Sequence, residues 1–372
     1  MSEDYQGSIA QKNVTFITQT VVSTVPGANY NKIMIFVGDS QSATYFTATE
    51  PPAAGYAVEL NSTNYDTITQ GKLKNWLADF FGSSSVATAW IVVYDDLVEA
   101  VWNATDLGVQ YEAYKTLAFF KLCIYDTEDA DLALAALIKA EGKDKKLSQQ
   151  WIGTSDEDTL DKEAVDGIVY DLNQAGTLDP VVVYHYDTER NPALVQLGET
   201  LAIANVTGVF VGNSMDYLQT NKIDPSGTDG VNLGPDEYGD LEDQNVGYFT
   251  YIGNGTTYVA LQGGFNLNGD IACAFWIKSF IEYVCEIKSA ELITQLNKYR
   301  NNDTYQSILL ILQEQLNRFT TLGRFIETKI TAPVFSALTA SGDTITIPNA
   351  WQANYVDNLR EATVYGTLYI TV

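Results

Sequence analysis

The chain has one histidine, His185, and this residue limits the acid–base chemistry that the sequence can support. Imidazole is the side chain whose ordinary pKa lies closest to neutral pH, so a serine or cysteine triad would have to recruit it. His185 lies inside an apolar, β-branched run at residues 181–186, which is typical of a packed strand. We therefore interpret it as a structural histidine and expect no catalytic residue.

The common signatures of cofactor and metal sites are absent from the sequence. It contains no G-x-x-x-x-G-K-[ST], no G-x-G-x-x-G after a strand, no H-E-x-x-H and no C-x-x-C motif. Two acidic clusters lack the spacing of a calcium-binding loop and are interpreted as solvated helix caps. These clusters are Asp240, Glu242 and Asp243, and Asp126, Glu128, Asp129 and Asp131. No cofactor or metal is therefore expected.

Charge is divided unevenly along the chain, whose formal net charge is -26. Residues 1–267 hold 13 Lys/Arg and 37 Asp/Glu, a net charge of -24, whereas residues 268–330 hold seven of each. An acidic surface repels phosphate backbones and anionic lipids within the screening length, so nucleic acid and membrane are not expected partners. No signal peptide is visible at residues 1–5, so the product is expected to stay in the compartment where it is made.

Strands and helices alternate from the first core strand to about residue 211. The predicted strands are residues 32–37, 90–94, 117–125, 150–153, 181–186 and 208–211, and the predicted helices are 73–81, 130–140, 162–173 and 193–204. Such alternation is typical of an α/β layer. A loop rich in Gly and Pro at 218–245 ends it, and Gly253-Asn254-Gly255 predicts a hairpin between residues 247–252 and 257–261.

A long helical pattern follows over residues 262–330, where apolar residues recur mostly in steps of three and four. Helices are expected from residue 270 to residue 330. Because positive and negative charges balance here, the basic side chains are candidates for contacts with other protein. They are Lys278, Lys288, Lys298, Arg300, Arg318 and Arg324.

Strands rich in β-branched residues stand at both ends of the chain, at residues 14–25 and 363–372, and a short strand is predicted at 344–347 before Pro348. A strand outside its domain exposes unpaired backbone groups, so each arm either joins the chain's own sheet or pairs with a neighbouring copy. We favour pairing with neighbours. The residues assigned to these arms are Val14, Phe16, Ile17, Val21, Val22, Val364, Leu368, Tyr369 and Ile370.

The order of elements from about residue 206 to the C-terminus resembles the contractile-phage tail sheath proteins, specifically the sheath-like group long catalogued as a domain of unknown function. The matching elements are the strand and loop at 208–216, the turn at 222–225, the segment LEDQNVGY at 241–248, Gly263-Gly264 with Gly269-Asp270, Trp276, the helix closing at Gly323, and Asn358-Leu359-Arg360 before the small-residue strand around Gly366.

The resemblance implies a fold of the α/β and α+β classes with four parts. They are arms at 1–25 and 351–372, an inner domain from 26–70 and 217–350, and an inserted outer α/β domain at 71–216. Sheath subunits stack as rings, hexameric in the family, around a tail tube and contract to drive it through the host envelope. The implied protein is a non-enzymatic virion tail subunit assembled in the host bacterial cytoplasm. Its implied partners are itself, the tail tube protein, and baseplate and tail terminator proteins.

Three other functions fit parts of the sequence. A tail tube or decoration protein would also show arms and no catalytic chemistry, although tube proteins are usually smaller β-barrels without long helices. An α/β hydrolytic enzyme would have to work with Asp and Glu alone. A carbohydrate-binding module would need exposed tyrosines, for which Tyr248, Tyr251 and Tyr258 beside the predicted hairpin are candidates.

Overall fold

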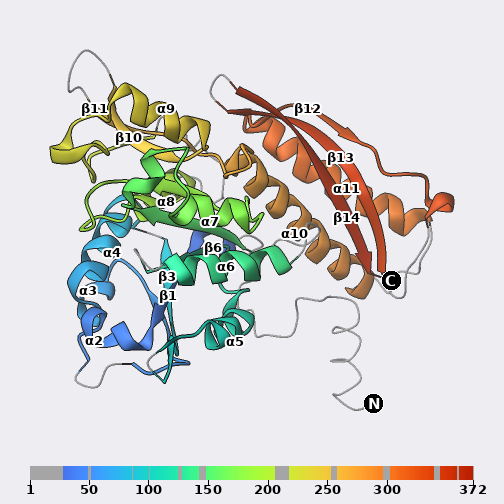
Figure 1. Cartoon of the computed structure of the whole chain (residues 1–372). Helices are drawn as coiled ribbons and strands as arrows, with labels where there is room; N and C mark the ends of the chain where they lie inside the picture. The colour runs from blue at the N-terminus through green and yellow to red at the C-terminus, as the bar shows by residue number, and fades with distance from the viewer. Residues whose placement is uncertain are drawn as a thin grey trace. The chain divides into compact units, whose positions relative to one another are not determined.

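The computed structural model describes residues 28–48, 52–85, 87–99, 101–124, 128–141, 148–205, 218–252, 258–295, 302–338, 344–357 and 360–371 (Figure 1). The chain divides into two compact units. We call Asn29–Cys273 the α/β unit, and Met1–Ala28 with Ala274–Val372 the terminal unit. Residues 14–25, predicted as the N-terminal arm, lie outside the described residues. Among the described helices, none is long and apolar enough to cross a membrane.

The α/β unit is built on a nine-stranded sheet in the order β2-β3-β1-β6-β7-β8-β10-β11-β9. The strands are β1 Lys32–Gly38, β2 Ala57–Leu60, β3 Thr88–Tyr94, β6 Phe120–Cys123, β7 Gln149–Thr154, β8 Val181–Tyr184, β9 Gln219–Thr220, β10 Gly247–Ile252 and β11 Tyr258–Gln262. The six strands from β3 to β10 in this order are parallel, and antiparallel pairs flank them on both sides. A small separate hairpin, β4 Leu97–Val98 with β5 Val101–Trp102, follows β3.

Helices cover the sheet and bury its apolar side chains. They are α2 Ser42–Tyr45, α3 Tyr65–Ile68, α4 Gly71–Ser83, α5 Thr105–Tyr114, α6 Glu128–Ala140, α7 Ile168–Gln174, α8 Pro192–Asn205 and α9 Pro235–Asp243. Met34 and Phe36 of β1 pack in one core cluster with residues of α5 and α6, whereas Val182 and Tyr184 of β8 pack in another with α7 and α9. The strands are buried along nearly their whole length, as expected for parallel strands covered by helices.

The predicted alternation of strands and helices is confirmed, and the largest changes of boundary are two. The strand expected at 117–125 is reduced to β6, Phe120–Cys123. The helix expected from residue 162 begins only at Ile168, because Asp161 and Asp166 accept bonds from nearby backbone amides and Gly167 has a φ of 88°. Such local bonds compete with a helix start. The strand expected at 208–211 lies outside the described residues, and the 247–261 hairpin is confirmed as β10 and β11.

The two units do not coincide with the predicted division into 26–70 with 217–350 and 71–216. The physical reason is strand pairing across those boundaries. Ile33 of β1 lies opposite both Ala89 of β3 and Phe120 of β6, and β8 pairs with β10. Strands from both predicted domains therefore share one sheet and one compact unit. The assignment of an inner and an outer side stays a prediction.

The terminal unit consists of two long helices and a three-stranded antiparallel sheet in the order β12-β13-β14. Its elements are α10 Ala272–Gln295, α11 Asn302–Thr321, β12 Phe325–Ile330, β13 Thr344–Asp357 and β14 Arg360–Thr371. Aromatic rings link these elements in series. Ring centroids are 5.9 Å apart for Phe280 and Phe319, 5.8 Å for Phe319 and Phe325, and 6.1 Å for Phe325 and Trp351. This chain of rings is the centre of the unit's core.

The prediction of helix up to residue 330 is wrong for its last part. Gly323 has a φ of 71°, and Arg324 donates its amide to the carbonyl of Phe319, which ends α11 in a left-handed cap. The segment that follows, Phe325–Ile330, is strand β12.

The strand predicted at 344–347 continues through Pro348 to Asp357. Between Ile347 and Trp351 the register with β14 shifts, and Asn349 has a φ of 51°. This bulge accommodates the proline, which has no amide hydrogen to donate.

Candidate functional site

A pocket of about 380 Å³ opens beside the carboxyl ends of β1 and β3 in the α/β unit. β1 is a switch point of the sheet, since β3 lies on one side of it and β6 on the other. Ligands of open α/β sheets bind at such points, so an enzyme of this fold class would hold its substrate here. The lining residues are Gly38, Ser40, Gln41, Tyr94, Asp96, Leu97, Trp102, Ile124, Glu128 and Asp129.

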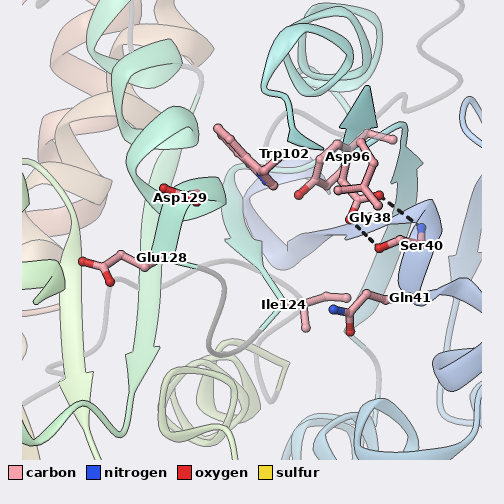
Figure 2. A pocket seen from close by; sticks show the side chains of 10 residues that line it. Gly38, Ser40, Gln41, Asp96, Trp102, Ile124, Glu128 and Asp129 are labelled. Carbon is pink, nitrogen blue, oxygen red and sulfur yellow. Dashed lines mark hydrogen bonds between the residues drawn. The ribbon is translucent and has the colours of Figure 1, made fainter. Parts of the chain in front are cut away.

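The polar side chains of the pocket include one pair joined by hydrogen bonds. The buried carboxylate of Asp96 accepts bonds from the Ser40 amide at 3.1 Å and the Ser40 hydroxyl at 2.6 Å (Figure 2). Glu128 and Asp129 lie apart from this pair, on α6 (Figure 2). None of the lining residues is a histidine or cysteine, so Ser40 has no imidazole to accept its proton.

One further carboxyl group lies next to Asp96. Burial, a hydrogen bond to Asp96 and repulsion by Asp95 and Asp96 raise the pKa of Asp39 above its ordinary value of 3.8. Asp39 does not line the pocket. In the part of the chain that the structure describes, no group of three or more His, Cys, Asp or Glu could hold a metal ion. The bonds between Asp96 and Ser40 fix the turn after β1.

His185 is buried directly after β8 and is held by two backbone groups. Its Nδ1 accepts the amide hydrogen of Asp187 at 3.1 Å, so the ring proton lies on Nε2, which donates to the Asp224 carbonyl at 3.0 Å. Burial is the main cause that lowers the pKa of His185 below 6.5. The neutral ring uses both nitrogens for hydrogen bonds to the backbone of two loops, which agrees with the interpretation of His185 as a structural histidine.

We expect His185→Gln to leave any assembly of the protein unchanged and to alter only stability. The unfolded chain binds a proton more readily than the folded ring, so the stabilisation by neutral His185 is present above pH 6.5 and is lost as the pH falls below 6.5 towards the lowered pKa of the folded ring. The unfolding free energy of the wild type should therefore approach that of the variant as the pH is lowered from about 7 into the range below 6.5. Urea titrations across this range measure the difference. A hydrolase or transferase activity of the wild type that the variant lacks would contradict the structural role.

The C-terminal strand predicted at 363–372 is present as β14, and its pairing along one edge is with β13 of the same chain. Val364, Leu368, Tyr369 and Ile370 all lie in β14, and Leu368 is buried. Val14, Phe16, Ile17, Val21 and Val22 lie outside the described residues. Pairing of either arm with another copy stays a prediction.

The two edges of the three-stranded sheet differ. At one edge, β12 is short, and its register shifts between Phe325 and Glu327. At the other edge, β14 runs for 12 residues, and no strand of the described residues pairs with its outer side. A long edge presents a row of unpaired N–H and C=O groups, whereas bulges block strand addition. The outer edge of β14 is therefore the better template for a strand from another chain.

Four of the six basic candidates lie in the described residues, and Lys298 and Arg300 lie outside them. Lys288 approaches Glu314 with its Nζ 3.5 Å from Oε2. The Arg318 guanidinium lies 5.6 Å from the centroid of the Phe280 ring, and burial lowers the pKa of Arg318. Both side chains therefore have partners inside the terminal unit. No ion pair of Lys278 is found among the described residues, and Lys278 stays a candidate for an external contact.

The division of charge follows the two compact units. The α/β unit holds 12 Lys/Arg and 36 Asp/Glu, a net charge of -24, and the terminal unit holds 9 and 11, a net charge of -2. The segregation of charge seen along the sequence thus follows the division into two compact units. Surfaces of the α/β unit repel one another, whereas those of the terminal unit do not.

Sequence reasoning missed the β4–β5 hairpin. Its strands have two residues each, too few to show a period, although two apolar pairs around Glu99 and Ala100 are a weak hairpin signal.

Two solved structures are similar to this chain. One is a chain of the anti-feeding prophage (AFP) baseplate, determined by cryo-EM with 6-fold symmetrisation, with a TM-score of 0.61 at 10% identity over 90% of this chain and 91% of that chain. The other is a chain of the AFP helical sheath in the contracted state, with a TM-score of 0.56 at 12% identity over 96% of both chains. No protein-family model and no curated protein matches the sequence. The similarity confirms the fold expected from the sheath resemblance.

Proposed function

We propose that this protein is a structural subunit of a contractile tail sheath. It polymerises as stacked rings around a tail tube and contracts to drive the tube through a host envelope. The observation that carries the proposal is the fold similarity to a chain of a contracted sheath over 96% of this chain. The switch-point pocket, which has no histidine or cysteine in its lining, and the structurally engaged His185 support a role without catalysis.

In this proposal the two arms hold the polymer together. The N-terminal arm of one subunit adds to the outer edge of β14 of a neighbour, which supplies backbone hydrogen bonds without a large side-chain interface. Such links let subunits rotate and slide without separating. Contraction draws its energy from a greater contact area in the contracted state, summed over many subunits.

In the proposed particle the charge-balanced helical segment at 270–330 faces the tube or a neighbouring subunit, and the acidic region at 71–216 faces outwards. The reason is charge, since the α/β unit carries -24 and the terminal unit only -2. Like charges discourage non-specific association between subunits that must slide past one another. The proposed partners are other copies in hexameric rings, the tube protein, and baseplate and terminator proteins. The proposed location is the virion tail, assembled in the host cytoplasm.

Electron microscopy of the purified protein tests this function. A sheath subunit should form tubes of stacked rings. Similarity to a baseplate chain favours, as a second candidate, a subunit that acts only at the baseplate, and this would give single rings. Discrete particles without rings would contradict both.

Reversal of Lys278 to Glu is expected to slow tube formation without unfolding the protein, because interfacial charges set register and association rate more than affinity. Light scattering during assembly measures the rate, and circular dichroism checks the fold. Lys139→Glu on α6 makes the same change of charge in the acidic unit and serves as the control. Equal rates for both variants would remove Lys278 from the proposed interface.

A further inference from the structure

The β4–β5 hairpin displays a concentration of exposed apolar side chains. Leu97, Val98 and Val101 are 39%, 51% and 69% exposed, and Val109 on α5 is also exposed. Four of the thirteen exposed large hydrophobic residues in the described chain thus fall within residues 97–109. Single exposed apolar residues are ordinary, but three on one small hairpin indicate an interaction surface.

The hairpin is held rigidly at its base. Asn103 donates its amide to the Asp96 carbonyl at 2.9 Å, and the Asp96 carboxylate is held by Ser40. Figure 2 shows this carboxylate next to Gly38, where any side chain would overlap it. Trp102 packs against the core cluster that contains Met34 and Phe36 of β1. A two-stranded hairpin is marginal by itself in water, and these anchors present it in a fixed conformation.

Only negative charge surrounds the hairpin in sequence. Residues 75–114 contain six Asp/Glu and no Lys/Arg. Asp95 and Glu99 are exposed, next to the apolar side chains. A matching surface must therefore offer apolar contacts flanked by positive charge. This requirement disfavours the α/β unit of another copy, whose net charge is -24.

The terminal unit has such a surface where α11 turns into β12. Leu322 and Ile326 are 38% and 62% exposed, and Ile326 stands at the bulge of β12. Arg324 is half-buried and Lys329 exposed, while Glu327 is the one carboxylate of residues 315–338. We call residues 322–329 the α11–β12 corner. The corner holds Arg324 and Lys329 against Glu327, a net charge of +1, and is therefore complementary to the acidic hairpin.

We propose that the β4–β5 hairpin of one copy docks on the α11–β12 corner of a second copy. The inference rests on the proposed function, because only a polymer of this chain brings many copies together. Aliphatic side chains of the hairpin cover Leu322 and Ile326, and Glu99 and Asp95 face Lys329 and Arg324. The contact is additional to strand addition by the arms.

Cross-linking between two different single-cysteine variants tests the contact. Val101→Cys and Ile326→Cys proteins are mixed before assembly, and the tubes are treated with a short bis-maleimide. A Val101–Ile326 product of two chains can form only between copies. The three native cysteines are buried, so wild-type tubes give the background. Two control pairings use other exposed positions. In one, Val165→Cys in the α/β unit takes the place of Val101→Cys, and in the other, Leu310→Cys on α11 takes the place of Ile326→Cys.

Docking predicts a yield for the Val101–Ile326 pair at least about fivefold above both control pairings, because the contact raises the local thiol concentration. Equal yields, or cross-links between two Val101→Cys copies, would overturn the proposed contact. Tubes that form normally without the product would overturn the contact and leave the proposed function standing. A wild-type protein that forms no rings or tubes would refute both.

Discussion

Deletion of residues 1–24 is expected to leave a soluble, folded protein that no longer forms tubes. Every strand pair of the three described sheets comes from residue 32 onward, so the deletion removes no described pair. In the proposed polymer the same deletion removes one added strand per subunit. Each backbone hydrogen bond contributes about 0.5–1.5 kcal/mol, so a lost strand weakens every link by several such bonds. Circular dichroism measures the fold and electron microscopy the tubes.

A shorter deletion serves as the control. Residues 1–12 are polar and precede the predicted strand at 14–25, so their removal should preserve the tubes. Unfolding of the longer deletion variant would show that residues 14–25 belong to the chain's own core. Normal tubes from that variant would show that the arm does not link subunits.

The alternating part of the fold could be predicted because each element carries its own period. In α4, Leu73, Trp76, Leu77 and Phe80 are buried at helical spacing, and β1 is a continuous apolar run. Pairing between strands that are distant in the sequence produces no periodic pattern within either strand. The union of β1, β3 and β10 in one sheet therefore could not be derived from the sequence.

The strand β12 was missed for a different reason. Leu322 and Ile326 continue the steps of three and four that run through α11, so the apolar period alone favours a longer helix. The positive φ of Gly323 ends the helix, and the sequence alone does not show which φ a glycine adopts. For β14 the strand itself was predictable, but its partner was not, because pairing within a chain and between chains uses the same backbone bonds.

Substitution of Gly366 by valine is expected to disrupt the sheet of the terminal unit. Gly366 lies opposite Trp351, and a side chain at this position would overlap the buried indole. Trp351 contacts Phe325, the next ring of the aromatic series. Displacing the indole should cost about 3–5 kcal/mol, the range measured for removing a buried large aromatic side chain. Urea unfolding followed by near-ultraviolet circular dichroism measures this loss.

A double-mutant cycle separates the overlap from a general effect of β14. Gly366→Ala alone already places a methyl group on the indole and should also cost about 3–5 kcal/mol, and the same change with Trp351→Leu should cost less, because the smaller side chain leaves room. Gly239→Ala in α9, where nothing lies within 4 Å of the new methyl group, should be neutral or slightly stabilising. Equal costs of Gly366→Ala in both backgrounds would contradict the packing of Trp351 against Gly366. The α/β unit has its own core and should stay folded in the Gly366→Val variant. Loss of tubes in this variant would then indicate that the sheet β12-β13-β14 is needed for the proposed assembly.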